Sequence, residues 1–549
     1  MNKKQRTIRL NLALILFSMG MALYAQDFYT AGERRHWLEK AHEYTPKLVE
    51  TDMKPMNIVD IVKDQQAFQG WKAVRGSSME LFYKSPIKEQ SGVVVDFGEH
   101  MTGYFTFSVA PLQTTPDAPA RFKFTFGEVP AELATPFDPY PGGLSRAWLQ
   151  DEIVTVMTVP DTITIPRRLA FRYVKIELIA APNYEFTISD MKCKAVTSVS
   201  TIPESLPATV SPIIQKIDKT GLNTLKECMQ TVYEDGPKRD QRLWIGDLYL
   251  ESMANNYSYK QYNLTQRCLY LLAGLADENG YLNATVFERP QPHPQAKQFL
   301  FEYALLYNVT LKDYLVATGD QETVLDLWPV AKRQLDIVRQ YLQKDGMMDF
   351  ERVCKEWWVF FDWKSDLYKE VALQGVSIYA FAESYELAKM IGKEKEVADL
   401  PVSVKRMKQA AHKNFYDKKR GLFVGTKNKQ ISYASQIWMI LSGVASKAEG
   451  RQALSALTST ADVCRPGTPY LYHYYIQSMV DCGMDKEAKE ALVNFWGGMI
   501  EKGADTFWEA YDPDNDIISP YNFYPMNSYC HAWSCTPVYF IRKYPSIFQ

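Results

Sequence analysis

Two neighbouring stretches, GVVVDFGEH (residues 92–100) and GYFTFSV (residues 103–109), set the character of the first half of the chain. β-Branched and aromatic residues dominate both stretches, a pattern typical of strands with a buried face. Three stretches of the same kind follow: ARFKFTFGE (120–128), DEIVTVMTV (151–159) and RYVKIELIA (172–180). Clusters of Gly, Pro and Asp separate them, notably TTPDAPA and TPFDPYPGG. Short strands with such turns between them predict an antiparallel β-sandwich, which we place at residues 57–205.

The hydrophobic period changes after Pro203, and apolar residues then recur at helical spacing as far as the C-terminus. We predict eleven helices, near residues 209–232, 244–258, 262–277, 296–318, 321–344, 371–391, 393–416, 432–446, 470–482, 484–501 and 529–542. No constant repeat length is visible, which argues against a regular solenoid. We therefore predict a closed ring of helical hairpins over residues 206–549, with function carried by the irregular, aromatic-rich loops at its mouth.

The composition excludes several classes of protein. The 549 residues include 62 Lys and Arg against 64 Asp and Glu, a net charge of −2, so the chain lacks the basic surface of a general nucleic-acid binder. Aromatic residues make up 13%, which suits either a ligand cleft or a large core. With seven His and no CxxC or HxxxH spacing, we predict no metal site and no cofactor, while a calcium ion held by loop Asp side chains stays open.

The N-terminus reads as a targeting segment. Four basic residues precede the apolar run of residues 10–23, and small residues stand at Ala22 and Ala25. The run is shorter than the ~20 residues that cross a bilayer. We predict a secretory signal peptide at residues 1–25, an N-terminal extension at 26–56, and a mature protein that is secreted or periplasmic, outside the membrane. That compartment permits disulfides, but the eight scattered Cys are more typical of buried thiols, and the sequence does not give pairings.

Two segments far apart in the chain combine carboxylates with Trp. EDGPKRDQRLWIGD (residues 234–247) surrounds the helix-breaking Gly236–Pro237 with three Asp, and KGADTFWEAYDP (residues 502–513) carries Glu509 beside Trp508. Cleavage of a glycosidic bond needs one acid to protonate the leaving oxygen and a second carboxylate on the other face of the sugar. A charged loop is equally compatible with a solvated turn, so composition alone does not settle the role of these segments.

The first segment resembles the signature of glycoside hydrolase family 78, the α-L-rhamnosidases, which is usually D-C-P-Q-R-E-x-L-G-W-x-G-D. The matching residues are Asp235, Pro237, Arg239, Trp244, Gly246 and Asp247. GADTFWE resembles the family segment with the general base, and SYCHAWSCTPVYF (residues 528–540) resembles its closing helix with an active-site His. TPYLYHYYIQSM (468–479) and the pair Asp362–Trp363 are similar to family segments, less specifically. The strands from residue 92 are similar to the family's β-sandwich.

The resemblance implies an (α/α)6 barrel, or six-hairpin glycosidase domain, behind the β-sandwich. It also implies release of terminal α-L-rhamnose from a carbohydrate substrate with inversion of configuration. By the same resemblance Asp240 is the general acid and Glu509 the base. The residues expected to hold the sugar are Asp235, Arg239, Trp244, Asp247, Trp363 and His531.

One position departs from the family, because its general acid is Glu and this chain has Asp240, which is one methylene shorter. Asp240 stands seven residues before Asp247, as the family's acid does relative to the equivalent Asp, so we predict that it still acts as the acid. It would need to hold a proton near neutral pH, through burial against Trp244 and the nearby Asp235 and Asp247. An inverting pair would have carboxyl groups ~6.5–9.5 Å apart.

Other interpretations stay open from the sequence. Another (α/α)6 glycosidase, such as an unsaturated glucuronyl hydrolase, would need cations for the uronate, which Lys238, Arg239 and Arg242 could supply. A non-catalytic rhamnose-glycan-binding relative would follow if the acid has decayed to Asp. An extracellular scaffold would need the aromatics only as core. The leaving group, the linkage and the oligomeric state cannot be read from the chain; 287–295, 356–363 and the Tyr-rich segment after Pro520 are expected to form the rim of a leaving-group pocket.

Overall fold

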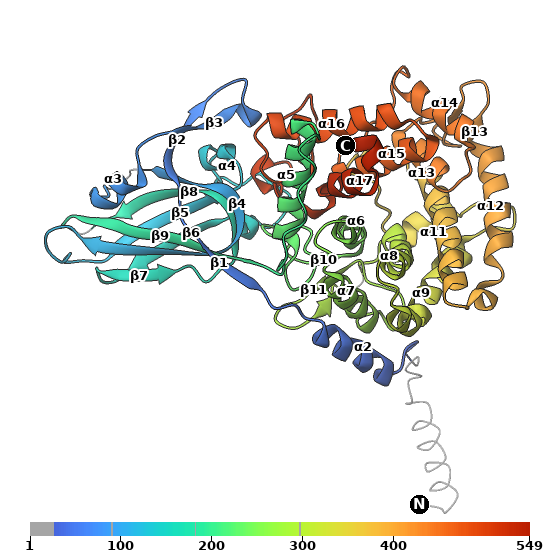
Figure 1. The fold of residues 1–549 in the computed structure, drawn as a ribbon, viewed down its shortest axis with the longest axis horizontal. Coiled ribbons are helices and arrows are strands. Elements are labelled where there is room, and N and C mark those ends of the chain that lie inside the picture. The colour runs from blue at the N-terminus through green and yellow to red at the C-terminus, as the bar shows by residue number, and fades with distance from the viewer. Residues whose placement is uncertain (1–26, 89–91, 182, 296–297) are drawn as a thin grey trace, which may run out of the picture.

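The computed structural model describes residues 27–88, 92–181, 183–295 and 298–549. They form a β domain and a larger helical domain that lie side by side (Figure 1). The predicted signal peptide, residues 1–25, lies outside the described residues. Among the helices that the structure describes, none combines the length and the apolar character needed to cross a membrane.

The β domain is built on one antiparallel sheet. Its strands are β1 (Val49–Met53), β2 (Asn57–Lys63), β3 (Trp71–Arg75), β4 (Val93–Pro111), β5 (Ala120–Gly127), β6 (Asp151–Val156), β7 (Asp161–Thr164), β8 (Leu169–Ala180) and β9 (Phe186–Thr197). Six of them pair in the order β1-β9-β4-β8-β5-β6. Strands β2 and β7 also pair with β4, and β3 pairs with β2. The two stretches with which the sequence argument began are therefore halves of one long strand, β4.

Strand β4 bends, which lets the sheet fold over itself. Its register against β8 shifts between Asp96 and Met101; before the shift β4 pairs with β2, and beyond it with β9 and β7. Such irregularities bend a strand. The interior between the folded parts is filled by buried Phe: Phe97, Phe105, Phe107, Phe122, Phe124, Phe126, Phe171 and Phe186. Alternate residues of the strands supply this core, as the sequence pattern predicts.

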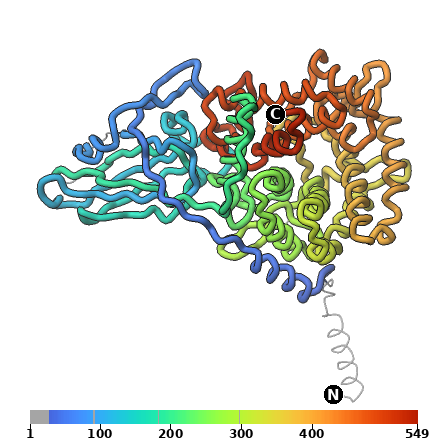
Figure 2. Tube along the Cα trace, in the orientation of Figure 1, coloured from blue at the N-terminus to red at the C-terminus, as the bar shows by residue number. Residues whose placement is uncertain are grey.

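An N-terminal arm crosses from one domain to the other (Figure 2). Helix α2 (Ala31–Glu43) packs on α7 (Tyr262–Gly274) of the helical domain, and β1 then pairs with β9. The predicted extension at residues 26–56 thus contributes a helix to one domain and a strand to the other. Strand β9 ends at Thr197 and α5 begins at Pro212, on either side of the predicted boundary at 205–206.

Six helical hairpins make the helical domain within the described residues. They are α5 (Pro212–Cys228) with α6 (Ile245–Asn256), α7 with α8 (Phe301–Thr318), α9 (Gln321–Tyr341) with α11 (Glu370–Met390), α12 (Leu400–Phe415) with α13 (Tyr433–Leu441), α14 (Lys447–Leu457) with α15 (Pro469–Cys482), and α16 (Asp485–Glu501) with α17 (Pro537–Lys543). The second helices of the hairpins contact one another in sequence around an inner ring, which α17 closes against α6.

Burial explains why the helical period is clear in some segments and blurred in others. Inner helices such as α8 and α11 bury polar and apolar residues on almost every side, whereas the outer helices α9 and α12 keep an exposed polar face. The outer-to-inner connections α5–α6, α7–α8, α9–α11 and α16–α17 meet at one end of the ring, where their residues line one pocket. That end carries the functional site.

The predicted helices differ from the observed ones in several places. The segment 529–542 is helical only from Pro537, because residues 528–536 form a loop with a short 3-10 turn, η5 (Ala532–Ser534). Helix α12 starts at Leu400 rather than 393, after the 3-10 turn η3 (Glu394–Val397). Helix α14 and the short α10 (Phe350–Glu356) were not predicted.

Shorter elements complete the chain. They are α3 (Met79–Lys84), α4 (Pro130–Ala134), α18 (Pro545–Phe548), η1 (Phe68–Gly70), η2 (Arg146–Trp148), η4 (Tyr524–Met526) and the strands β10 (Leu243–Trp244), β11 (Thr285–Phe287), β12 (His293–Pro294), β13 (Tyr416–Asp417) and β14 (Leu422–Phe423). The eight Cys form no disulfide, and all except Cys354 are buried, as the sequence favours.

Candidate active site

One pocket of about 250 Å³ opens at the end of the ring that faces the β domain. All eight residues expected at the site line it: Asp235, Arg239, Asp240, Trp244, Asp247, Trp363, Glu509 and His531. They come from the connections α5–α6, α9–α11 and α16–α17 and, for Asp247, from the first turn of α6, so the ring brings together residues that are far apart in the chain. Their chemical roles stay predictions.

The loop before α6 is shaped by Asp235. Its carboxylate accepts hydrogen bonds from the backbone N–H groups of Asp240 (3.1 Å) and Arg242 (3.3 Å), which folds the loop around it. Burial, and then the nearby Asp240, raise the pKa of Asp235 to about 7. Gly236 is required for the same turn, because a Cβ there would lie 2.5 Å from the carbonyl oxygen of Arg239.

Arg239 stands between the two predicted catalytic carboxylates. Its Nη2 lies 2.6 Å from Oε2 of Glu509, and its Nη1 lies 3.1 Å from Oδ1 of Asp240. The guanidinium also covers the ring of Tyr521, 4.3 Å from its centroid. The other oxygen of Asp240 pairs with Arg242 at 3.2 Å. The acid loop and the base therefore share one buried, planar cation, which fixes their relative position.

Glu509 is buried and held as an anion. Its Oε2 accepts the backbone N–H of Ser528 (3.1 Å), and its Oε1 accepts the hydroxyl of Tyr521. Burial opposes ionisation, but Arg239, His531, Tyr521 and Ser528 outweigh it and lower the pKa of Glu509 to about 2. An ionised carboxylate at this place can accept a proton from water.

Asp247 and His531 form a second polar pair on the pocket wall. Oδ1 of Asp247 lies 3.4 Å from Nε2 of His531, and both side chains are 3% exposed. Burial raises the pKa of Asp247; for His531 burial acts the other way, yet Asp247 and Glu509 raise its pKa. Oδ1 of Asp247, both ring nitrogens of His531 and Nε1 of Trp363 have no hydrogen-bond partner among the described residues. Such buried polar atoms on a pocket wall are suited to ligand hydroxyls.

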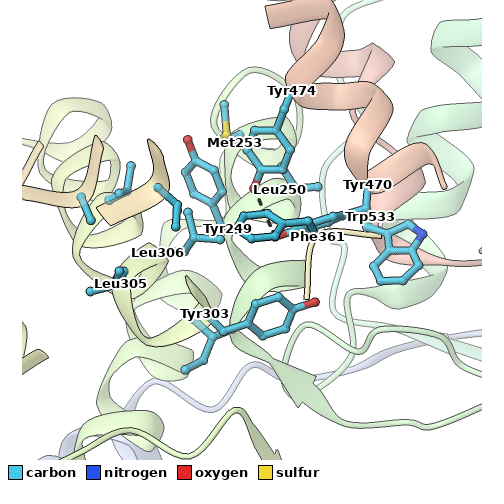
Figure 3. Packing of buried hydrophobic residues seen from close by; sticks show 14 of the residues in the cluster. Tyr249, Leu250, Met253, Tyr303, Leu305, Leu306, Phe361, Tyr470, Tyr474 and Trp533 are labelled. Carbon is cyan, nitrogen blue, oxygen red and sulfur yellow. Dashed lines mark hydrogen bonds between the residues drawn. The ribbon is translucent and has the colours of Figure 1, made fainter. Parts of the chain in front are cut away.

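Aromatic rings make the walls and floor of the pocket. Trp363 packs edge-on to Phe360 at 4.9 Å and to Tyr521 at 6.0 Å, and Phe360 stacks on Trp533 at 5.9 Å. Figure 3 shows Tyr303, Tyr470 and Trp533 among the buried aromatic side chains of the ring; the ring centroid of Tyr470 lies 6.2 Å from that of Tyr303 and 5.5 Å from that of Trp533. A flat apolar wall next to convergent charged groups is the usual composition of a small-molecule site.

Several pocket residues were not in the predicted site. Three segments expected at the rim do contribute: residues 287–295 supply Gln295, 356–363 supply Trp358 and Phe360, and the segment after Pro520 supplies Tyr521. The remaining members of the lining are Leu144, Trp148, Arg242, Gln298, Leu300, Tyr303 and Trp533. Trp533 had a usable signal, since it stands two residues after His531 in the segment that resembles the family. Leu144 and Trp148 come from the β domain and had none.

The sequence did not indicate two of the ion-pair arrangements around the site. Asp240 is paired with two arginines, Arg239 and Arg242, in addition to its contact with Asp235. Lys238, considered as a ligand for a uronate, does not line the pocket but is bound to Glu128 and Glu132 of the β domain. No cluster of three or more His, Cys, Asp or Glu suited to a metal ion occurs within the ranges that the structure describes.

Comparisons with known proteins agree with this architecture. Residues 55–195 match the family model of the glycosyl hydrolase family 78 alpha-rhamnosidase N-terminal domain. Residues 206–544 match that of the bacterial alpha-L-rhamnosidase six-hairpin glycosidase domain. A search of curated proteins gave no match.

Solved structures show the same relationship. A rhamnosidase from Klebsiella oxytoca with rhamnose bound is 37% identical, with a TM-score of 0.89 over 93% of this chain and 99% of that one. A family 78 rhamnosidase of Bacillus sp. GL1 is 18% identical (TM-score 0.68, 86% of this chain and 49% of that one). The Streptomyces avermitilis α-L-rhamnosidase complexed with L-rhamnose is 16% identical (TM-score 0.64, 91% and 44%). The last two show the fold alone.

These matches confirm the predicted order of an antiparallel β domain followed by a six-hairpin domain. They also confirm the predicted enzyme class. The chain belongs to glycoside hydrolase family 78, the α-L-rhamnosidases, and is a glycosidase.

Proposed function

We propose that the protein releases terminal α-L-rhamnose from glycans or glycosides by inverting hydrolysis. The observation that carries the proposal is the bridge from Asp240 through Arg239 to Glu509 at the wall of an aromatic pocket. The 37% identical Klebsiella oxytoca enzyme, which holds rhamnose, supports the choice of sugar. The pocket volume of about 250 Å³ is below the range of ~300–1,000 Å³ typical of small-molecule sites, which favours a single terminal sugar unit.

In this mechanism Asp240 donates a proton to the leaving oxygen while Glu509 takes a proton from the attacking water. Glu509 is suited to its part because Arg239 and its hydrogen bonds keep it ionised. The two carboxylates contact different nitrogens of one guanidinium rather than each other. Inversion requires the two carboxyl groups to stand ~6.5–9.5 Å apart, so that the attacking water fits between the base and the sugar.

The remaining pocket residues would bind the sugar. Asp247 and His531 offer polar atoms that lack a partner within the described residues, which suits hydroxyl groups. Trp363 and Trp244 present flat rings for the apolar face of the sugar, and Asp235 lies beside the acid. Binding and catalysis are thus assigned to different side chains and can be tested separately.

A time course on p-nitrophenyl α-L-rhamnoside, with the product anomer followed by NMR, tests the proposal. We expect release of nitrophenol and the β-anomer of L-rhamnose as the first product. First formation of the α-anomer would show retention and refute the inverting assignment. Saturable binding without release would refute hydrolysis of this substrate.

We also propose that the chain is exported through its N-terminal segment. The basic residues before the apolar run of residues 10–23, and Ala25 at the expected cleavage point, support this. Fractionation of cells that express the full chain should recover the enzyme outside the cytoplasm, with Gln26 as the first residue by N-terminal sequencing. A matched chain lacking residues 1–25 should stay in the cytoplasm, and equal export of both would refute the proposal.

A further inference from the structure

The β domain touches both loops that carry the proposed acid and base. Phe68 stacks on Trp508, the neighbour of Glu509, with 4.0 Å between ring centroids. Gln69 donates a hydrogen bond to the hydroxyl of Tyr529 at 2.5 Å. These contacts lie behind the pocket, because neither Phe68 nor Gln69 lines it.

One carboxylate of the β domain joins the two loops directly. Glu128, at the end of β5, is fully buried; its Oε2 lies 2.9 Å from Nζ of Lys238 and accepts the backbone N–H of Tyr529 at 2.7 Å. Its Oε1 lies 3.1 Å from Nε2 of His100. Both partners of Oε2 are next in sequence to residues that hold the proposed catalytic pair.

We propose that Glu128 is a positioning residue that sets the relative placement of Asp240 and Glu509. On one side, Lys238 precedes Arg239 and Asp240, so its ammonium anchors the acid loop. On the other side, Tyr529 follows Ser528, whose N–H donates to Oε2 of Glu509. A single side chain outside the pocket thereby connects the acid to the base. The inference rests on the roles proposed for Asp240 and Glu509.

The surroundings of Glu128 make this connection stiff. Lys238 also pairs with Glu132 at 2.7 Å, and the second oxygen of Glu132 accepts the backbone N–H groups of Glu128 (2.6 Å) and Val129 (3.1 Å). The carbonyl oxygen of Pro525 lies 3.3 Å from the same ammonium. These partners restrict the movement of Lys238 and of the acid loop that follows it.

Stability alone does not explain the buried ionic cluster of Glu128, Lys238 and Glu132. Replacing buried ion pairs with apolar residues is often neutral or stabilising, because the desolvation of the charges offsets their attraction. Ion pairs with fixed partners can instead hold loops in a defined geometry. A mutation far from the reacting atoms that displaces a catalytic group by about 1 Å can lower the rate about 100-fold. The cluster lies between the loops that carry Asp240 and Glu509, so it is placed to hold these two carboxylates at a fixed separation.

The test compares Glu128→Gln with a matched variant, Asp218→Asn. Asp218 is also a buried carboxylate paired with a cation, Arg542 at 2.7 Å, but it lies between α5 and α17 and does not line the pocket. For Glu128→Gln we expect kcat on p-nitrophenyl α-L-rhamnoside to fall by about 10- to 100-fold with KM within about threefold. Asp218→Asn should leave both constants near those of the wild type.

The pH profile separates positioning from simple loss of structure. Glu509 owes its low pKa to Arg239 and Ser528, among others, so loosening either loop should move the acidic limb of kcat/KM to higher pH in Glu128→Gln. Glu128→Asp, which keeps the charge but is shorter, should lower kcat while the melting temperature stays close to that of the wild type, and it serves if the Gln variant does not fold. A fall in melting temperature with an unchanged acidic limb and unchanged kcat would overturn the inference.

Hydrogen exchange gives a readout that does not depend on the substrate. Amides in residues 236–242 and 527–531 should exchange faster in Glu128→Gln than in the wild type, and equally in Asp218→Asn and the wild type. Unchanged exchange in both loops would refute the positioning role even if the enzyme hydrolyses rhamnosides. Faster exchange in an enzyme with no rhamnosidase activity would keep the positioning role and refute the proposed function.

Discussion

The hydroxyl of Tyr521 donates a hydrogen bond to Glu509, and its removal by Tyr521→Phe should raise the pKa of that carboxyl. The pKa of Glu509 is about 2 because Arg239, His531, Tyr521 and Ser528 together outweigh its burial. A hydrogen bond to a charged group contributes roughly 1.5–3 kcal/mol, and one pKa unit corresponds to about 1.4 kcal/mol. The substitution should therefore raise the pKa by about one to two units, to about 3–4.

The pH dependence of kcat/KM on p-nitrophenyl α-L-rhamnoside measures this shift. A base that must be ionised loses activity as the pH falls through its pKa, so the acidic limb of Tyr521→Phe should stand about one to two units above that of the wild type. Tyr524→Phe is the matched control, because Tyr524 lies in the same loop but its hydroxyl bonds with Thr135. Circular dichroism at each pH shows whether the protein is folded. Superimposable acidic limbs would refute the assignment of Tyr521 and Glu509.

Four further outcomes follow from the geometry. Asp240→Asn and Glu509→Gln should each lower kcat on the nitrophenyl rhamnoside by at least about 100-fold with little change in KM, and near-normal kcat in either would show that the residue is not the acid or base. Trp363→Ala should mainly raise KM, which initial rates over a range of substrate concentrations would show; an unchanged KM would remove Trp363 from the binding wall. Gly236→Ala should lower the free energy of unfolding by about 1–3 kcal/mol in urea titrations, and it should also lower kcat. The reason is that the added Cβ would press on the Arg239 carbonyl oxygen. Wild-type values of both quantities would show that the loop adapts to the added methyl group. Because the folded-state pKa of Glu509 is lowered, its ionisation should contribute about 3 kcal/mol of stability that is present above pH ~4.5 and lost as the pH falls through about 2, and Glu509→Gln should not show this loss.

Much of the fold could be predicted because local pattern and tertiary environment agree. The strands around Phe105 and Phe124 bury alternate residues, so the period of two is plain in the sequence. Helix α14 was missed although Ser446 and Glu449 form a capping box, a signal that was present and not used. The expected helix before Pro537 failed for another reason: the backbone there bonds to distant loops, as His531 does to Phe507, and no local pattern reveals that.

The site was predicted to the extent that its residues share short segments. Asp235, Asp240 and Asp247 lie in one segment and Glu509 lies in another, and the resemblance of both segments to family 78 marked them as candidates. Trp148 and Glu128 illustrate the opposite case. Both belong to the β domain, and their place at or behind the pocket depends on how the two domains dock. The packing of one domain on the other depends on many residues that are far apart in the chain, and no local pattern in a single sequence reveals it.

The N-terminal arm reverses the usual relation between the order of synthesis and the order of assembly. Helix α2 and strand β1 leave the ribosome before the segments they contact, because β1 has no partner until β9 has been made and α2 has none until α7 exists. The arm must therefore wait, and it completes the structure by joining the two domains. Before folding is complete the N-terminal arm is therefore accessible to proteases, and once α2 and β1 have docked it is protected from the same cleavage.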